Sequence, residues 1–525
     1  MPGSTRILRA AARHADSTPV TAATLLRDEE DTGDPTTSRE DGSARRASWL
    51  RRAAVVAAFL ALFGIYFSSP VWSRSDPLWV PYTAQRLLDH QDLDLSARGF
   101  RVGDDYALVE QDGQVVSYFP WTTAALTTPL VVLHRMIEPF GIVTPLEVQL
   151  QDHDVGQFQR FAGGLFAAAA AMVLALLTRR LLRLADRRGE DGDGDVEVDS
   201  DPIIADRWWF VPLCTFVFGL GTSLWSTASR GLWQHGPGIL VLGGAWLAAL
   251  HDPSPVDAGN DSALRRFPVI TSGVLAGLAF GVRPTNVVPV IALGAFLAWR
   301  RRETLMTWVI SLLGVVVAVI GANVVLLGSP LPSYFSADRA GFHPEYVRAV
   351  IDDVLSPSRG LVVFSPWLVL AVLTLLPARR RMLGGDVVAF AWTALAGCVG
   401  SLLVAASYGE HWWAGHSYGP RFLSETVVVL GPLALLAVFG PRPATTAARR
   451  LSTVVAPILI VVSMLMHAPG ALTEVTECWS RSPVDVDTSP ARVEDWSDPQ
   501  FVAGWVTLVS DGPAAPISVC QARRS

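Results

Sequence analysis

Long apolar blocks that contain almost no charge are the feature that most constrains this sequence. Residues 53–66, 309–327 and 423–439 are examples. A bilayer core of about 30 Å requires helical segments of this length and composition. Only 17% of the 525 residues are charged, whereas a soluble chain usually has about a quarter. The sequence therefore predicts an all-α polytopic membrane protein.

Clusters of arginine lie between the apolar blocks and predict which helix ends face the cytoplasm. The six clusters are Arg45, Arg46, Arg51 and Arg52; Arg179 and Arg180; Arg265 and Arg266; Arg300, Arg301 and Arg302; Arg379, Arg380 and Arg381; and Arg449 and Arg450. Cytoplasmic segments next to a membrane carry an excess of basic residues, and all six clusters fit one side. This pattern predicts a multi-pass protein of the cell membrane with a cytoplasmic N-terminus and an external C-terminus.

One path through the membrane satisfies both the apolar blocks and the arginine clusters, and it contains about eleven transmembrane helices. The predicted helices are 53–70, 157–178, 208–225, 234–250, 267–282, 285–299, 304–327, 361–377, 386–406, 422–439 and 451–467. They belong to a transmembrane domain of residues 48–468. Residues 1–47 are polar, lack an apolar period and are predicted to be a disordered cytoplasmic tail.

The path leaves the larger hydrophilic segments outside the membrane. The predicted external segments are the loops 71–156, 328–360 and 407–421 and the C-terminal tail 469–525. Residues 119–137 within the first loop are apolar enough to suggest a further helix, which as a span would invert the rest of the path. They contain Pro120 and Pro129, and their uncharged apolar run of about 13 residues is short for a span. We therefore predict an interfacial helix on the outer leaflet.

The chain contains no lysine, so its basic residues other than histidine are all arginines. Schiff-base chemistry and a Walker A phosphate loop both need lysine, and both are therefore excluded. A bound phosphate must instead be held by arginine, by backbone amides or by a metal ion. The sequence also lacks a glycine-rich nucleotide motif, and no nucleic-acid partner is predicted.

The four cysteines are divided between apolar blocks and the hydrophilic tail. Cys214 and Cys398 lie in apolar blocks and are predicted to be small buried side chains. Cys478 and Cys520 lie in the predicted external tail, where oxidising conditions favour a disulfide between them; two free thiols are the alternative. The cysteines show no metal-ligand spacing, and no metal or other cofactor is predicted.

Single arginines at predicted external helix ends are the first candidate binding residues. They are Arg230, Arg283, Arg359 and Arg421. Each alone is explained by snorkelling to lipid headgroups or by pairing with a carboxylate. Four on one membrane face, with His235, Glu410 and His411 nearby in the sequence, instead predict a site for an anionic lipid headgroup. His411 and His416 lie five residues apart in a loop, which is weak evidence for a metal site.

Asp76 is the candidate catalytic residue, and it has two interpretations. It stands a few residues after the first helix and immediately before Pro77. Aspartate followed by proline at the first helical position is a good N-cap, so the residue can be purely structural. Its position at the outer membrane surface, where a lipid-borne phosphate also lies, favours a functional role.

Five stretches, taken in their order along the chain, resemble a known family. They are the Asp76 segment, Val116-Ser117-Tyr118-Phe119-Pro120-Trp121, Gly281-Val282-Arg283-Pro284-Thr285-Asn286, Ser358-Arg359-Gly360-Leu361-Val362-Val363-Phe364-Ser365-Pro366, and Trp413-Ala414-Gly415-His416-Ser417-Tyr418-Gly419-Pro420-Arg421-Phe422. Over about 50–440 the chain resembles the GT-C superfamily of glycosyltransferases that use polyprenyl-phosphate sugars. This superfamily includes bacterial protein O-mannosyltransferases and lipid A aminoarabinose transferases.

The resemblance implies a GT-C-like bundle that transfers a sugar from a polyprenyl-phosphate donor to an acceptor hydroxyl at the outer face of the membrane. The acceptor is a glycan, a lipid or a protein. The resemblance makes Asp76 the general base and implies inversion at the anomeric carbon. The family often has a second acidic residue after this aspartate, but here the position is Pro77, which favours a single-carboxylate site over a metal-binding pair.

Two other functions stay open at the level of the sequence. A transporter or flippase of polyprenyl-linked lipids should carry polar or charged residues near the middle of several helices, whereas the charges here gather at helix ends and in external loops. A non-catalytic assembly subunit with the same fold would tolerate the loss of Asp76.

Overall fold

The structure is a computed structural model that describes residues 35–73, 76–191, 204–251, 262–335, 340–409, 411–442 and 445–510. Two of the residues singled out above, Glu410 and Cys520, and residues 1–34 of the predicted cytoplasmic tail therefore lie outside the described residues. The chain divides into a unit of residues 1–50 and a unit of residues 51–525. The candidate site lies within the second unit.

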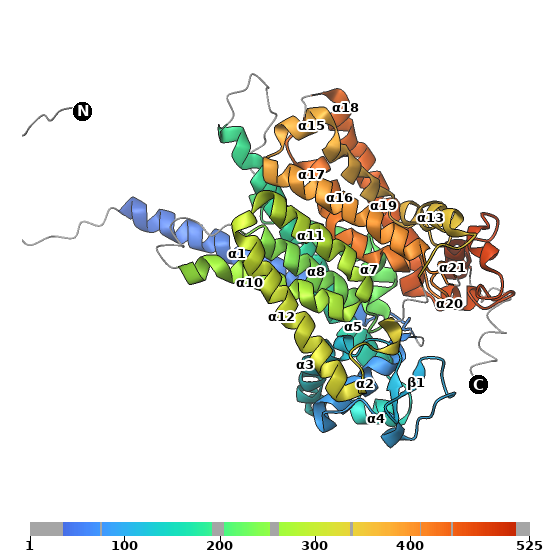
Figure 1. Ribbon diagram of the computed structural model, residues 1–525. Helices are drawn as coiled ribbons and strands as arrows, with labels where there is room; N and C mark the ends of the chain where they lie inside the picture. Colours follow the sequence, from blue (N-terminus) through green and yellow to red (C-terminus); the bar gives the residue numbers. More distant parts are fainter. Residues whose placement is uncertain are drawn as a thin grey trace, which may run out of the picture. The chain divides into compact units, whose positions relative to one another are not determined.

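Helices make up most of the described chain (Figure 1). The long helices are α1 (Pro35–Phe67), α5 (Gly156–Asp191), α10 (Ser262–Val282), α12 (Arg302–Leu327), α16 (Gly385–Ala406) and α19 (Ala456–Leu472). The shorter ones between them are α6 (Phe210–Leu220), α7 (Ser223–Ser226), α8 (His235–Ala249), α11 (Val287–Arg300), α14 (Leu361–Phe364), α15 (Pro377–Met382), α17 (Val427–Phe439) and α18 (Thr446–Arg450). Two 3₁₀ segments, η9 (Pro366–Leu375) and η10 (Arg421–Thr426), continue α14 and precede α17.

The predicted class, an all-α polytopic membrane protein, is confirmed. Among the described residues, six helices are long and apolar enough to cross a membrane, or seven if the bent pair α6 and α7 forms one span. Four further apolar helices are 10–17 residues long. Six or seven of the approximately eleven predicted spans thus meet the criteria of length and composition, and the shorter predicted helices correspond to α8, the end of α10, α11 and η9.

The bend between α6 and α7 shows how the local sequence breaks the predicted helix 208–225. The two helices meet at 56°, after Gly219 and Gly221, which weaken a helix interior. Thr222 adopts an extended conformation, and its hydroxyl accepts a hydrogen bond from the Leu224 amide. This N-cap satisfies an amide that would otherwise lack an intrahelical partner, and it starts the new helix.

Helix α5 lies at the centre of the bundle because one of its faces is made of small residues. Ala167, Ala168, Ala170, Ala171 and Ala175 are fully buried. Small side chains let neighbouring backbones approach closely, which is how helices pack in a membrane. α5 accordingly packs against α6, α8 and α17.

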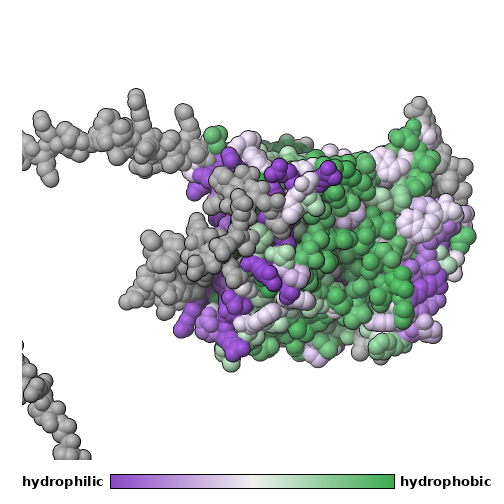
Figure 2. Space-filling view, turned by 90° about the horizontal axis from the view of Figure 1, so that it is seen from above, coloured by the Kyte–Doolittle hydropathy of each residue, from purple (hydrophilic) through white to green (hydrophobic). Residues whose placement is uncertain are grey.

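The surface of the bundle carries a broad hydrophobic area between hydrophilic borders (Figure 2). α12 contributes strongly to the exposed apolar surface, since only 6% of its most apolar window is buried. Its exposed side chains include Met306, Ile310, Leu313, Val317 and Val325. An apolar surface of this kind on a helix of 26 residues is suited to contact with lipid.

The first predicted external loop folds into short helices and one hairpin. It contains η1 (Asp76–Trp79), α2 (Val80–His90), α3 (Thr122–Ile137) and α4 (Leu146–Gln151), with strands β1 (Leu108–Gln111) and β2 (Gln114–Ser117). The strands pair antiparallel, with Leu108 opposite Ser117. Asp112 and Gly113 join them with φ values of 50° and 73°, as a two-residue turn that matches the strand twist requires. This hairpin was not predicted from the sequence.

Helix α3 corresponds to the segment 119–137 that was predicted to be interfacial. It has 16 residues and includes Pro129, and it is not among the helices that meet the criteria for a span. It packs against α2 and α10, and its buried face includes Thr123, Thr127 and His134. Its position on the outer leaflet stays a prediction.

The described part of the C-terminal segment after α19 is folded. It contains α20 (Val475–Trp479), η12 (Pro490–Glu494) and α21 (Gln500–Val509). α21 packs against α19 and α20. Near this segment, α13 (Tyr346–Leu355) packs against α14 and α16.

Candidate active site

Four segments that are distant in the sequence meet at one end of the bundle. Asp76 opens η1, His235 begins α8, Arg283 follows the end of α10, and Arg421 begins η10. Interactions given below connect all four side chains. The sequence predicted each of these residues for the site, but it gave no pairing among them.

The Asp76 carboxylate forms an ion pair with Arg421. The Tyr106 hydroxyl also donates a hydrogen bond to it. The side chains of Asp76 and Arg421 are 14% and 13% exposed. The pair is therefore sheltered from water but still within reach of a ligand.

Aromatic rings hold the Arg421 guanidinium in position. Its central carbon lies 4.0 Å from the centroid of the Trp233 ring and 5.8 Å from that of Phe422. Planar guanidinium groups stack on aromatic faces, and the attraction grows when water is excluded. Trp233 is 5% exposed, so this ring gives Arg421 a fixed orientation toward Asp76.

A second group of charged side chains, which is buried, adjoins the Asp76–Arg421 pair through Phe422. The Glu425 carboxylate lies 2.9 Å from His235 Nδ1 and 2.5 Å from Arg283 Nη1. Arg283 also lies over the Phe422 ring at 5.7 Å. Together, Asp76, Arg421, Phe422, Arg283, Glu425 and His235 form one connected group, which we call the charge cluster.

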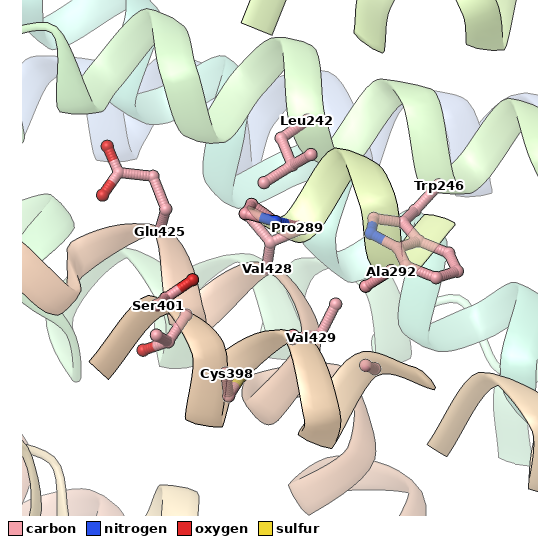
Figure 3. A pocket seen from close by; sticks show the side chains of 12 residues that line it. Leu242, Trp246, Pro289, Ala292, Cys398, Ser401, Glu425, Val428 and Val429 are labelled. Atoms are coloured by element: carbon pink, nitrogen blue, oxygen red, sulfur yellow. The ribbon is translucent and has the colours of Figure 1, made fainter. Parts of the chain in front are cut away.

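Two small cavities adjoin the charge cluster at Glu425. One is lined by Arg283, Thr285, Asn286, Ser401, Val404, Ala405, Tyr408, Phe422, Glu425 and Thr426. The other has the Glu425 side chain at one end and Leu242, Trp246 and Val429 further along (Figure 3). It contains about 280 Å³ of space not filled by atoms, open solvent included. Charged and apolar surfaces thus adjoin each other here.

The charge cluster balances two arginines against two carboxylates. Removing one partner of a buried ion pair leaves a charge without compensation, which costs about 3 to 5 kcal/mol. An anion that enters the cluster must therefore displace a carboxylate from an arginine. The less buried Asp76–Arg421 pair is the easier one to exchange.

Arg230 and Arg359 do not join the charge cluster. Arg230 is 2% exposed, and its guanidinium donates to the carbonyl of Tyr66 near the end of α1 at 3.0 Å. Arg359 is 1% exposed and donates to the Trp413 carbonyl at 2.7 Å and to Gln500 Oε1 at 2.6 Å. Substrate contact by either arginine stays a prediction, and these bonds support a structural role.

The environment of Arg359 also makes the charged form of its guanidinium less favourable. Burial lowers the pKa of its guanidinium to about 9, and the neighbouring positive charge of Arg421 acts in the same direction. Its bonds to carbonyl and amide oxygens compensate for lost water. Arg359 thereby fixes the loop before η10 to the C-terminal segment.

The remaining candidates of the loop 407–421 lie apart from the charge cluster. His411 is exposed, and its ring stacks on Trp413 at 5.6 Å. Glu410 is outside the described residues. His416 lies 2.7 Å from Asp485 and 3.4 Å from Asp487, a contact across about 70 residues that spacing in the sequence could not reveal.

The cysteines follow their predicted distribution in the part of the chain that the structure covers. Cys214 is buried, Cys398 is partly buried, and both are free. Cys478 is 5% exposed and takes part in a disulfide. Because Cys520 is outside the described residues, the pairing of Cys478 with Cys520 stays a prediction.

Glu425 is the main site residue that the sequence analysis missed. It lies in the apolar block that was predicted to be the helix 422–439. A carboxylate inside such a block is expensive and marks a functional site by default. That signal was present, whereas nothing in the sequence indicated that Tyr106 and Trp233 contact Asp76 and Arg421.

Comparisons with known proteins give two distant structural neighbours. No protein-family model and no curated protein matches the chain. One solved structure is the archaeal oligosaccharyltransferase AglB from Archaeoglobus fulgidus in complex with an inhibitory peptide and a dolichol-phosphate. It shares 13% sequence identity with this chain at a TM-score of 0.44. The alignment covers 88% of this chain and 64% of that chain. The other is the apo form of the Archaeoglobus fulgidus oligosaccharyltransferase, at 12% identity and a TM-score of 0.43, over 89% of this chain and 61% of that chain.

The chain thus spans less than two thirds of the length of either neighbour.

Proposed function

We propose that this chain is a GT-C-type membrane glycosyltransferase. It transfers a sugar from a polyprenyl-phosphate donor to an acceptor hydroxyl at the outer face of the membrane. The contact that carries the proposal is the Asp76–Arg421 pair, because it joins a candidate base to a candidate phosphate ligand. Arg283 extends the positive side of the same cluster, and His235 lies beside it.

The donor phosphate enters by exchange of ion-pair partners. A phosphate group accepts strong, charge-assisted hydrogen bonds from a guanidinium, so it competes with Asp76 for Arg421. Trp233 keeps the Arg421 guanidinium in place during the exchange. Arg421 then binds the phosphate, and the Asp76 carboxylate is released next to the bound donor.

The released carboxylate performs the chemical step. The acceptor oxygen attacks the anomeric carbon while the bond from this carbon to the phosphate oxygen breaks. Asp76 takes the hydroxyl proton, and the polyprenyl phosphate leaves with the electron pair. A positioned carboxylate base supplies about 10²- to 10⁴-fold in rate, and arginine stabilises the charge that develops on the leaving phosphate.

The position of the charges favours this reaction over lipid transport. Glu425 lies only four residues after Arg421, at the start of the span Arg421–Phe439. A carrier needs its charged residues near the middle of the membrane. The charge cluster instead adjoins the loop that carries Asp76, which suits chemistry at the surface.

The Asp76→Asn variant tests the assignment of the base. Asparagine caps a helix about as well as aspartate but lacks the charge that pairs with Arg421, so we expect a folded protein of lower thermal stability and a loss of transfer of about 10²- to 10⁴-fold. The measurement is transfer of label from radiolabelled polyprenyl-phosphate sugars in membranes. Transfer at the wild-type rate would reduce Asp76 to a structural cap.

The orientation in the membrane is tested separately. We propose a cytoplasmic N-terminus and an external loop 71–156, because the arginine clusters then lie on one side. Single cysteines introduced at positions 145 and 190 should react with an impermeant thiol reagent from opposite sides. Reaction of both from the same side would mean that the segment 119–137 crosses the membrane.

A further inference from the structure

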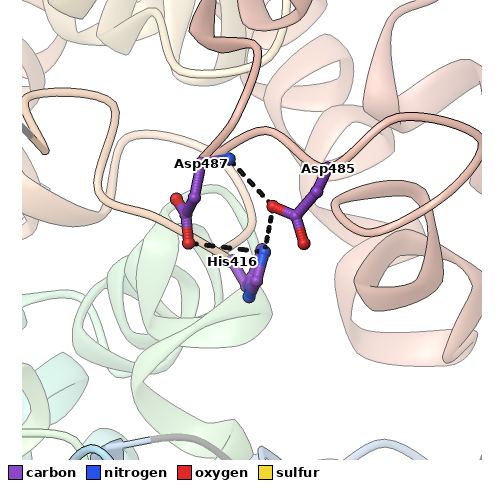
Figure 4. A group of neighbouring side chains, drawn as sticks. All are labelled: His416, Asp485 and Asp487. Carbon is purple, nitrogen blue, oxygen red and sulfur yellow. Dashed lines mark hydrogen bonds and ion pairs between the residues drawn. The ribbon is translucent and has the colours of Figure 1, made fainter.

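A group of three metal-ligating side chains joins the loop before η10 to the C-terminal segment. His416 lies in that loop, and Asp485 and Asp487 lie between α20 and η12. The three side chains face one another (Figure 4). Their candidate ligand atoms all lie within 4.8 Å of one another.

We propose that His416, Asp485 and Asp487 bind a divalent transition-metal ion that fastens the C-terminal segment to the loop carrying Arg421. Atoms bound to one ion at about 2.0 to 2.2 Å lie roughly 3 to 3.6 Å apart. His416 Nε2 already lies 2.7 Å from Asp485 Oδ1 and 3.4 Å from Asp487 Oδ2. Small side-chain rotations are therefore enough to give all three a common ligand position.

A cation satisfies this arrangement better than hydrogen bonding alone. A neutral histidine has one N–H, so the nitrogen that faces both carboxylates can donate its proton to only one of them at a time. The two carboxylates also repel each other at this separation. A divalent ion neutralises both charges and takes the imidazole nitrogen as a third ligand.

The position of Asp487 is set by a residue outside the group. Trp413 Nε1 donates a 2.8 Å hydrogen bond to Asp487 Oδ1, while Oδ2 faces His416. Trp413 is 5% exposed, and its own carbonyl accepts from the buried Arg359. Hydrogen bonds that orient a ligating carboxylate in this way are typical of metal sites.

The ligand types select the kind of metal. Mg²⁺ and Ca²⁺ favour oxygen ligands, whereas imidazole suits Zn²⁺ and other first-row transition metals. Three protein ligands leave a further position for water. The site lies apart from the charge cluster and does not depend on the proposed transfer reaction. Its direct effect is to bring residues 485–487 against the loop 407–420.

Zinc binding to the full chain in detergent, after removal of metals by a chelator, tests the proposal. We expect one Zn²⁺ per chain to bind saturably in calorimetry. His416→Gln and Asp487→Asn should each weaken this binding at least tenfold, and Trp413→Phe, which removes the orienting N–H together with part of a buried ring, should weaken it by about tenfold. Asp495→Asn is the matched control, since Asp495 lies in the same segment and bonds locally to Ser497.

Hydrogen–deuterium exchange provides a second measurement that does not rely on affinity. Zn²⁺ should slow exchange in residues 480–489 of the wild type and of Asp495→Asn, but not of His416→Gln. Two results would overturn the proposal: the wild type binds no more Zn²⁺ than His416→Gln does, or Zn²⁺ does not change hydrogen exchange in residues 480–489. The three residues would then interact only through ion pairing.

Discussion

Arginines at the two ends of the helix bundle differ in their surroundings. At the end that includes α15 and α18 (Figure 1), Arg183 and Asp206 are 41% and 34% exposed, and Arg300 and Asp386 are 39% and 27% exposed. At the end of the charge cluster, Arg283 and Glu425 are 6% and 8% exposed. We call the first the wet end and the second the dry end after these pairs, although the second also carries exposed pairs, such as Arg135 and Asp89 at 38% and 28%.

This difference separates two uses of charge in one molecule. Exposed pairs contribute little to stability because water and salt screen them. Clusters of such arginines still bias the orientation in the membrane. A buried pair is sensitive to the loss of either partner, and its geometry is fixed by packing. The dry end is therefore the place where single substitutions should have large and specific effects.

Glu425→Gln should have the largest effect on stability. It leaves Arg283 buried without its carboxylate, and the expected loss is about 3 to 5 kcal/mol in the free energy of unfolding. The measurement is thermal unfolding of the purified protein in detergent. Asp386→Asn at the wet end is the matched control, and equal losses for the two variants would remove the distinction between the ends.

Arg421→Gln should have a smaller effect, and that effect should fall mainly on donor binding. A hydrogen bond to a charged group contributes about 1.5 to 3 kcal/mol, which corresponds to an increase of roughly 10- to 100-fold in the donor KM. Transfer should recover partly at high donor concentration. Arg300→Gln should leave the donor KM unchanged. A lower kcat with an unchanged KM would instead assign Arg421 to the transition state alone.

The sequence predicted the fold more completely than the site. Apolar length and arginine position are properties of single segments, so the helix ends were close: the helix predicted at 386–406 is Gly385–Ala406, and the one at 234–250 is His235–Ala249. The elements that differ from the prediction have local causes, which apolar length and arginine position do not reflect. The capped break at Thr222 and the turn at Asp112-Gly113 are both readable in principle from turn and cap residues.

Pairing between distant segments was beyond the sequence. Asp76 and Arg421 were both predicted for the site, yet their contact spans 345 residues. Arg230 and Arg359 have the same position at helix ends as Arg421, but their guanidinium groups bind backbone and amide oxygens. Packing decides which arginine contacts a carboxylate, and this pairing cannot be predicted from a single sequence.

The pH response should also differ between the two ends. Burial, and next the nearby Glu494 carboxylate, raise the pKa of Asp352 on α13 to about 7. At the wet end, burial acts to raise the pKa of Asp206, but hydrogen bonds from Arg179 and Arg183 outweigh it and hold this pKa below its usual value. Near neutral pH, therefore, only the first of these two carboxyl groups changes its charge.

The direction in which stability changes with pH follows from proton binding at Asp352. Between about pH 4 and pH 7 the folded state binds more protons at Asp352 than the unfolded state does, so stability falls as pH rises through this range. We expect a loss of about 1 to 2 kcal/mol locally. Hydrogen exchange of α13, corrected for its intrinsic rate, should be faster at pH 8 than at pH 5.5. Asp352→Asn should reduce this difference, and equal protection of wild-type α13 at both pH values would contradict the prediction.

The smallest effect is expected for an exposed arginine pair at the wet end. Asp386 pairs with Arg300 at 2.7 Å and with Arg301 at 3.6 Å, but the exposed pair with Arg300 should contribute only about 0.2 to 1 kcal/mol. A double-mutant cycle with Arg300→Gln and Asp386→Asn isolates that pair, since each variant removes one partner. Because screening shortens with salt, the coupling energy should fall further at about 1 M salt. Transfer activity should stay at the wild-type level in both single variants. A coupling energy as large as the loss for Glu425→Gln would show that exposure does not set the strength of these pairs, and the two ends of the bundle would then have to be treated alike.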